Sequence, residues 1–210
     1  MVEISIKKIK MPRWIVLAII LQLWVVYTYG SVAKMYPDWL DASVARNLMA
    51  GKKDYFLVGD FLQQPWVHYC IAYVGLLFDL LVIPLLLWKR TRWFIFAASI
   101  FFHLFNSFVF QIGIFPYLSL AFILFFFTTD TINKRFLWKK PHYDEDEIII
   151  PDYKPVLITA ASVWFIIQIG LPLRHYLIKD NVLWTEEGHR LSWRMMLRSK
   201  SAQTEFTVVN

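Results

Sequence analysis

The sequence predicts an all-α, polytopic membrane protein of about five transmembrane segments, followed by the start of a β-rich extramembrane domain. Of its 210 residues, 58% are hydrophobic, compared with roughly 45–50% in an ordinary water-soluble domain. Long apolar runs alternate with short basic clusters, and tryptophans flank several of the runs, as they do at both edges of a bilayer. Because the net charge of +6 is concentrated in those clusters, we expect lipid and not nucleic acid as the partner of the basic residues.

The apolar runs define five segments in chain order, at 14–35, 66–88, 93–110, 117–128 and 155–171. Each is expected to be helical, since a helix satisfies its backbone hydrogen bonds within one segment inside lipid. The third and fourth segments are shorter than the roughly 20 residues that a full crossing needs. We therefore expect them to be tilted, or to be broken where protein surrounds them.

The basic clusters predict the orientation. If all five segments cross, the clusters fall on one side of the membrane, which the positive-inside rule makes cytoplasmic. The loop at 37–65 and the tail after residue 174 then lie on the outer or luminal side, and we expect a bacterial inner membrane. The clusters consist of Lys7, Lys8, Lys10, Arg13, Lys89, Arg90, Arg92, Lys134, Arg135, Lys139 and Lys140.

The tail differs in composition from the apolar segments. We expect residues 1–175 to form the helical transmembrane domain and residues 176–210 to begin the β-rich domain. The stretch QTEFTVV near the end is typical of a strand, and a single strand has no sheet to complete it, so we expect the chain to stop inside that domain. A different reading of the tail is a surface for anionic lipid, based on Arg190, Arg194, Arg198 and Lys200.

A lysine lies at the end of the first segment. On a helix, Lys34 shares a face with Tyr27, Gly30 and Ser31, and the two small residues would allow a neighbouring helix to approach closely. One interpretation is a side chain that extends to the membrane edge and keeps its charge in water. The other is a buried amine that loses its proton and acts as a general base.

Three more polar residues lie inside the apolar segments. Asp79, in the middle of the second segment, should face the interior, where it either pairs with a buried polar group as a structural contact or serves a site directly. His103 and Asn106 are three residues apart on one helix face, as in an interhelical hydrogen-bonded pair. The break QIGIFP at 111–116 follows, and such breaks are tolerated where a chain lines a cavity.

Several kinds of chemistry have no motif in this sequence. The histidines lack the paired spacing of metal ligands, and Cys70 is the only cysteine. Motifs for serine hydrolases, P-loops and dinucleotide binding are also missing. We therefore expect no metal site and no nucleotide-driven reaction.

Four separate motifs, in order, resemble the vitamin K-dependent gamma-carboxylases and their bacterial relatives, the HTTM-domain proteins. The resemblance extends from about residue 14 to the end of the chain. The motifs are AKMYPDWL at 33–40, FDLL around Asp79, FHLFNSFVFQIGIFPYLSLAF at 102–122 and WTEEGHRLSWRMML at 184–197.

The resemblance implies a carbon–carbon lyase of the gamma-glutamyl carboxylase type. In that family a lysine amine deprotonates reduced vitamin K, oxygen adds, and the resulting base removes a γ-proton from a protein glutamate, which takes up carbon dioxide while the quinone leaves as an epoxide. Lys34 matches the second lysine of a motif like GVKKLDADWV, and Ala33 replaces the first. The residues implied to form the quinone cavity are His103, Asn106, Gln111, Gly113 and Pro116.

The implied cofactors are reduced vitamin K of the menaquinol or phylloquinol type, oxygen and carbon dioxide, with no metal. A glutamate-containing protein is the further expected partner, although the resemblance supports quinone epoxidation more firmly than glutamate carboxylation. Family members have additional helices before this segment and a longer β-rich domain after it, so we expect a fragment or a short form. The alternative from another class is a non-catalytic membrane scaffold or transport component with the same fold.

Overall fold

The computed structural model describes residues 13–136, 153–179, 182–194 and 204–205. Within these ranges, four helices are long and apolar enough to cross a membrane. They are α1 (Arg13–Val32), α5 (Pro65–Leu87), α6 (Arg92–Val109) and α9 (Lys154–Leu173). All four lie on segments that the sequence predicted, so the chain has the architecture of a multi-pass helical membrane protein.

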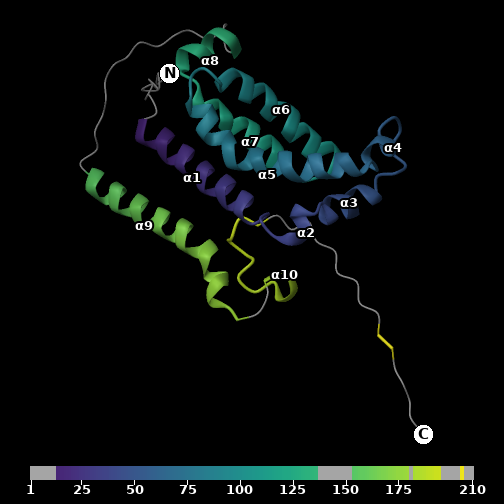
Figure 1. Ribbon diagram of the computed structural model, residues 1–210. Helices are drawn as coiled ribbons and strands as arrows, with labels where there is room; N and C mark the ends of the chain where they lie inside the picture. Colours follow the sequence, from purple (N-terminus) through teal and green to yellow (C-terminus); the bar gives the residue numbers. More distant parts are fainter. Residues whose placement is uncertain (1–12, 137–152, 180–181, 195–203, 206–210) are drawn as a thin grey trace, which may run out of the picture.

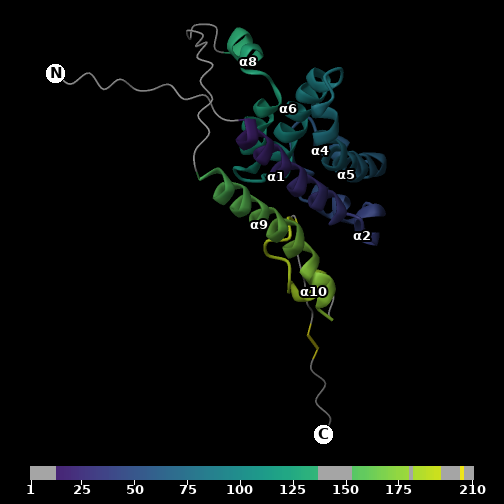
Figure 2. The same ribbon diagram turned by 90° about the vertical axis from the view of Figure 1, so that its left-hand side faces the viewer.

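Helix α1 lies between two parts of the molecule. It packs against α5 on one side and against α9 on the other, and α6 packs against α5 (Figure 1). Turning the molecule shows α9 as a separate layer beside α1 (Figure 2). The protein therefore consists of a bundle around α1 and α5, with α9 attached to its outside.

The fourth predicted segment, 117–128, forms a short helix. Helix α7 (Phe115–Ile123) continues as the 3₁₀ helix η1 (Leu124–Phe126), and the chain then bends by 120° into α8 (Thr129–Phe136). Twelve helical residues span about 18 Å, which is less than the roughly 30 Å hydrocarbon layer. The expected break in this part of the chain is therefore present, and α7 with η1 is a short or broken crossing.

The two ends of the bundle differ in character. At one end, the Arg135 guanidinium lies 5.0 Å from the centre of the Trp93 ring and the Arg92 guanidinium lies 5.9 Å from that of Phe127. We call this the basic end, because clusters that precede α6 and follow α7 meet there. The basic residues Lys7, Lys8, Lys10, Lys139, Lys140, Arg198 and Lys200 lie outside the described residues.

The opposite end, which we call the cap end, is covered by three short helices. They are α2 (Pro37–Leu40), α3 (Ser43–Ala50) and α4 (Gly59–Leu62), and all three contact α5. The buried Trp39 indole donates a hydrogen bond of 3.0 Å to the carbonyl oxygen of Ala72 on α5. The loop predicted at 37–65 is thus a compact helical cap.

The tail follows α9 through the 3₁₀ helix η2 (Arg174–Leu177) and the single turn α10 (Val182–Thr185). Its residues 188–194 then fold back toward the bundle, where Trp193 approaches Gly30 of α1. The described part of the tail has no strand, so the expected β-rich domain is not seen there. Most of the predicted strand at 203–209 lies outside the described residues.

Candidate functional site

The local sequence after α1 turns Lys34 into the protein. Helix α1 ends at Val32, and a turn in which the Lys34 N–H donates to the Ser31 carbonyl follows, at 2.9 Å. Tyr36 is extended, as expected for a residue that precedes proline, and Pro37 begins α2. The chain therefore leaves the membrane helix at Lys34 without releasing this side chain into solvent.

Lys34 is only 5% exposed and forms an ion pair with Asp79, which is 8% exposed. The amine also lies 5.3 Å from the centre of the Trp39 ring. This burial contradicts the interpretation in which Lys34 extends to the membrane edge. It agrees with the expectation that Asp79 pairs with a buried polar group, and the partner is the lysine itself.

Small residues allow α1 and α5 to approach closely at this level. Ser31 is fully buried, and its hydroxyl donates a hydrogen bond of 3.0 Å to the Leu76 carbonyl. A Cβ atom placed on Gly30 would lie 3.7 Å from an Asp79 carboxylate oxygen, which is ordinary contact. The close approach that Gly30 and Ser31 predicted is therefore present, and it brings Asp79 within reach of Lys34.

His103 forms a second polar contact between helices. Its Nε2 atom lies 2.8 Å from the Tyr27 hydroxyl of α1, and the residue is 1% exposed. The ring packs edge-on against Phe78, with 5.8 Å between ring centres. The expected interhelical hydrogen bond exists, and its partner is Tyr27. From the sequence, Tyr27 was expected only to share a helix face with Lys34.

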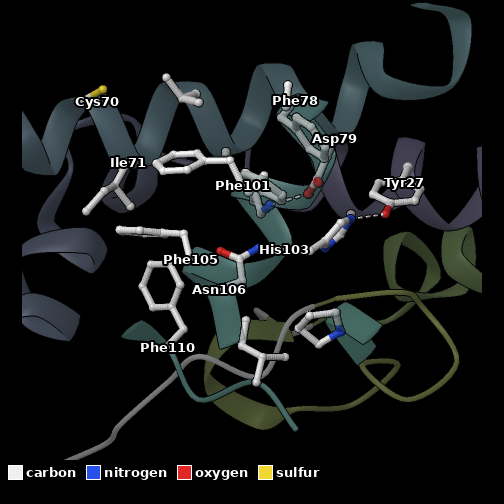
Figure 3. A pocket seen from close by; sticks show the side chains of 18 of the residues that line it. Tyr27, Cys70, Ile71, Phe78, Asp79, Phe101, His103, Phe105, Asn106 and Phe110 are labelled. Carbon is white, nitrogen blue, oxygen red and sulfur yellow. Dashed lines mark hydrogen bonds and ion pairs between the residues drawn. The ribbon is translucent and has the colours of Figure 1, made fainter. Parts of the chain in front are cut away.

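A cavity of about 380 Å³ lies among α1, α5 and α6 and extends to α4, α7 and the tail. Lys34, Asp79, His103, Asn106 and Pro116 all line it. Figure 3 shows His103 and Asn106 side by side near the middle of the cavity, with Asp79 on the helix above. The tertiary structure thus brings together five of the seven polar and break residues that the sequence singled out.

Gln111 and Gly113, the remaining two, lie outside the cavity wall. Both are exposed, and the Gln111 side chain donates a hydrogen bond of 3.2 Å to the Tyr55 hydroxyl. Gln111 also has a positive φ of 55°, so the break turns its side chain away. The break contributes Ile112, Phe115 and Pro116 to the cavity in their place.

The cavity wall is mainly aromatic and reaches the outer surface of the bundle. Its phenylalanines are Phe61, Phe78, Phe101, Phe102, Phe105, Phe110 and Phe115. Some wall residues are also strongly exposed, notably Phe101 at 75%, Trp66 at 60% and Val74 at 52%. Since these residues belong to the transmembrane helices α5 and α6, part of the cavity wall is exposed on the side of the bundle, where lipid would lie.

One wall residue comes from the tail and was missed in the sequence. Trp193 lines the cavity although more than eighty residues separate it from the end of α6. The motif WTEEGHRLSWRMML contains it, but helix periodicity offers no way to place a tail residue in a membrane cavity. Within the described residues, no group of three or more histidine, cysteine, aspartate or glutamate side chains could hold a metal.

Two family models match the chain. The HTTM domain matches residues 1–131, and the lumenal domain of vitamin K-dependent gamma-carboxylase matches residues 153–210. No solved structure matches it. The first model spans more than half of the chain and contains Lys34, Asp79 and His103, while the second contains Trp193. The chain therefore belongs to the HTTM and vitamin K-dependent gamma-carboxylase family of membrane proteins.

Proposed function

We propose that this protein catalyses the oxygen-dependent epoxidation of a reduced isoprenoid quinone of the vitamin K type, with Lys34 as the base. The observation that supports this most directly is a buried amine, paired with a carboxylate, in the wall of an apolar cavity. Carboxylation of a protein glutamate is the reaction that we expect this epoxidation to drive.

The Lys34–Asp79 pair offers a way to obtain a neutral amine. A lysine in water has a pKa of about 10.4 and is protonated at neutral pH, so it cannot accept a proton. Lys34 is buried beside the Asp79 carboxylate, which lies within reach to take up the proton of the amine. The neutral amine can then accept the proton of a quinol hydroxyl.

The cavity suits the ring of such a substrate. Its volume of about 380 Å³ falls within the range of roughly 300–1,000 Å³ found for small-molecule sites, which combine apolar walls with a few polar groups. Exposed wall residues on α5 and α6 would let an isoprenoid chain remain in lipid while the ring enters between the helices.

The substrate supplies the oxygen chemistry. After losing a proton, the reduced quinone reacts with oxygen, and one quinol and one O₂ yield one epoxide and one water. The protein has to bind the ring, accept the proton at the Lys34 nitrogen and keep bulk water away from that atom. The aromatic wall and the low exposure of Lys34 suit the last of these tasks.

The test is epoxide formation from reduced vitamin K in membranes that contain the protein, measured by mass spectrometry. Replacing Lys34 by alanine should lower the rate about 100-fold or more, because a positioned general base contributes at least that much. Lys34→Arg is the informative control, since guanidinium can still pair with Asp79 but stays protonated. An arginine variant with full activity would contradict the base role and favour the scaffold alternative.

Carboxylation is tested in the same membranes by supplying labelled carbon dioxide and a glutamate peptide. Label in the peptide that depends on Lys34 and on reduced quinone would support coupling of the two reactions. Epoxide formation without label in the peptide would indicate a quinone epoxidase that does not carboxylate glutamate.

A further inference from the structure

Trp193 extends from the tail into the cavity of the transmembrane domain. It lines the cavity together with Lys34 and His103. Its backbone oxygen would lie 3.8 Å from a Cβ atom placed on Gly30, so this part of the tail packs closely on α1. The indole Nε1 atom is buried and has no hydrogen-bond partner in the described part of the chain.

Contacts with η2, which directly follows α9, hold this part of the tail. Arg174 donates a hydrogen bond to the Arg190 carbonyl, and an Arg194 guanidinium nitrogen lies 2.8 Å from Nε2 of His175. Gly188 has a φ of 71°, and a Cβ atom there would lie 3.0 Å from that of His175, so only glycine fits this turn.

The backbone of Trp193 is itself in a costly conformation, with a φ of 54°. A left-handed φ is unfavourable for a bulky side chain and persists only where the surroundings impose it. The residue held in this conformation is one that lines the cavity. Strain of this kind is found at ligand sites more often than elsewhere.

A second cavity residue has an unsatisfied polar atom. His103 uses Nε2 to contact Tyr27, while its buried Nδ1 atom has no partner among the described residues. Buried polar groups without partners are rare in folded proteins, because each loses its hydrogen bonds to water and gains none. Trp193 and His103 both line the same cavity, where a ligand with oxygen atoms would satisfy both unpartnered nitrogens.

We propose that Trp193 and His103 bind the ring oxygens of the quinone, so that the tail completes the site built by the transmembrane helices. The indole N–H can only donate, so its partner is an acceptor oxygen of the ligand. His103 Nδ1 donates when Tyr27 donates to Nε2, and accepts in the other tautomer. The identity of the ligand rests on the proposed function, whereas the tail's participation rests on the contacts of Trp193.

The first test measures binding of an oxidised vitamin K quinone, which has two carbonyl acceptors and does not turn over. The whole protein in lipid nanodiscs is titrated, and the carbonyl stretch of the bound quinone is recorded by infrared difference spectroscopy. Trp193→Phe retains an aromatic ring and removes the N–H donor together with part of the indole, so it should weaken binding about 3- to 10-fold and shift the carbonyl band toward that of free quinone. Trp88→Phe is the matched control, because Trp88 is exposed and lies outside the cavity wall.

His103 is tested with two substitutions that separate its nitrogens. Glutamine retains a polar group near the Nε2 position, so Tyr27 keeps a partner while Nδ1 is lost. Asparagine retains a polar group near the Nδ1 position and leaves Tyr27 unpaired. We expect His103→Gln to bind quinone more weakly than His103→Asn, and His103→Asn to have the lower thermal unfolding temperature.

The two proposals fail in different ways. If the unmodified protein binds no quinone and forms no epoxide, the proposed function is wrong, and with it the ligand assigned to Trp193. If the unmodified protein binds quinone but Trp193→Phe matches Trp88→Phe in affinity and in the carbonyl band, the tail is not part of the site. In that case the quinone function stands without it.

Discussion

Helix α1 has two interfaces of different kinds. Toward α5 it presents Ser31, which is fully buried, and the turn after it leads to the Lys34–Asp79 pair. Toward α9 it presents Gln22 and Tyr29, and on α9 only Pro172 is buried. One interface is tightly packed around a charged pair, and the other is a loose contact held by hydrogen bonds.

The difference shows where the fold needs precise packing. Inside lipid, apolar contact between helices gains little over contact with lipid tails, so close packing and hydrogen bonds decide which helices associate. The α1–α5 interface uses both, and it forms the wall that holds the candidate base. The α1–α9 interface uses hydrogen bonds, and its role is to attach the helix that leads to the tail.

The largest expected effect comes from breaking the charged pair. Asp79→Ala leaves the Lys34 amine buried without its partner, which should destabilise the protein by about 3–5 kcal/mol. Thermal unfolding of purified protein in detergent measures this loss.

A double variant sharpens the same test. Replacing Lys34 by methionine and Asp79 by leucine removes both charges and retains most of the volume, so stability should return to near that of the unmodified protein. The double variant should still form no epoxide. A double variant as unstable as Asp79→Ala would mean that shape, and not the uncompensated charge, explains the loss.

The next effect concerns the packing of α1 on α5. Ser31→Leu replaces the hydroxyl oxygen by three carbon atoms at a fully buried position, and overpacking of this kind costs about 1–3 kcal/mol. Ser31→Ala removes only the hydrogen bond to Leu76 and should cost about 1 kcal/mol. Equal unfolding temperatures for the two variants would show that the helices can separate here, contrary to the close approach described above.

A smaller effect is expected at α9. The Gln22 side chain donates to Gln168 at 3.2 Å and accepts from the Trp164 indole at 2.9 Å. Gln22→Leu should cost about 1 kcal/mol, as interhelical hydrogen bonds in membranes are weak, and should leave Lys34-dependent epoxidation nearly unchanged. Adding Trp164→Phe should cost little more, because the bond it removes is already lost; additive losses of stability would contradict the pairing.

The smallest effect lies in the cap, between α2 and α3. Hydrogen bonds from the Ser43 hydroxyl and its backbone N–H lower the pKa of Asp41 below the usual 3.8. The pKa of Asp41 is lower in the folded state than in the unfolded chain. The stabilisation of the fold by these hydrogen bonds is therefore complete above about pH 5 and is lost as the pH falls through the folded-state pKa. The difference in unfolding temperature between the unmodified protein and the Asp41→Asn variant should therefore shrink only at acidic pH. A difference that stays constant with pH would contradict this prediction.

The transmembrane helices could be predicted closely from the sequence. The predicted segment 66–88 became Pro65–Leu87, and the segment 93–110 became Arg92–Val109. Hydropathy and helix period are local properties, so they identify a spanning helix without knowledge of its neighbours. The site was predicted less completely, because Gln111 and Gly113 lie outside the cavity and Trp193 was not anticipated.

The sequence by itself determined the class of protein, the helices that enter the membrane and the polar residues that must face inward. A lysine or an aspartate in an apolar run can only be accommodated away from lipid. The sequence did not determine which of these polar residues contact one another. The pairing of Lys34 with Asp79, the contact of His103 with Tyr27 and the entry of Trp193 into the cavity depend on how helices and tail pack against one another. Those contacts join residues far apart in the chain, and only the tertiary structure decided them.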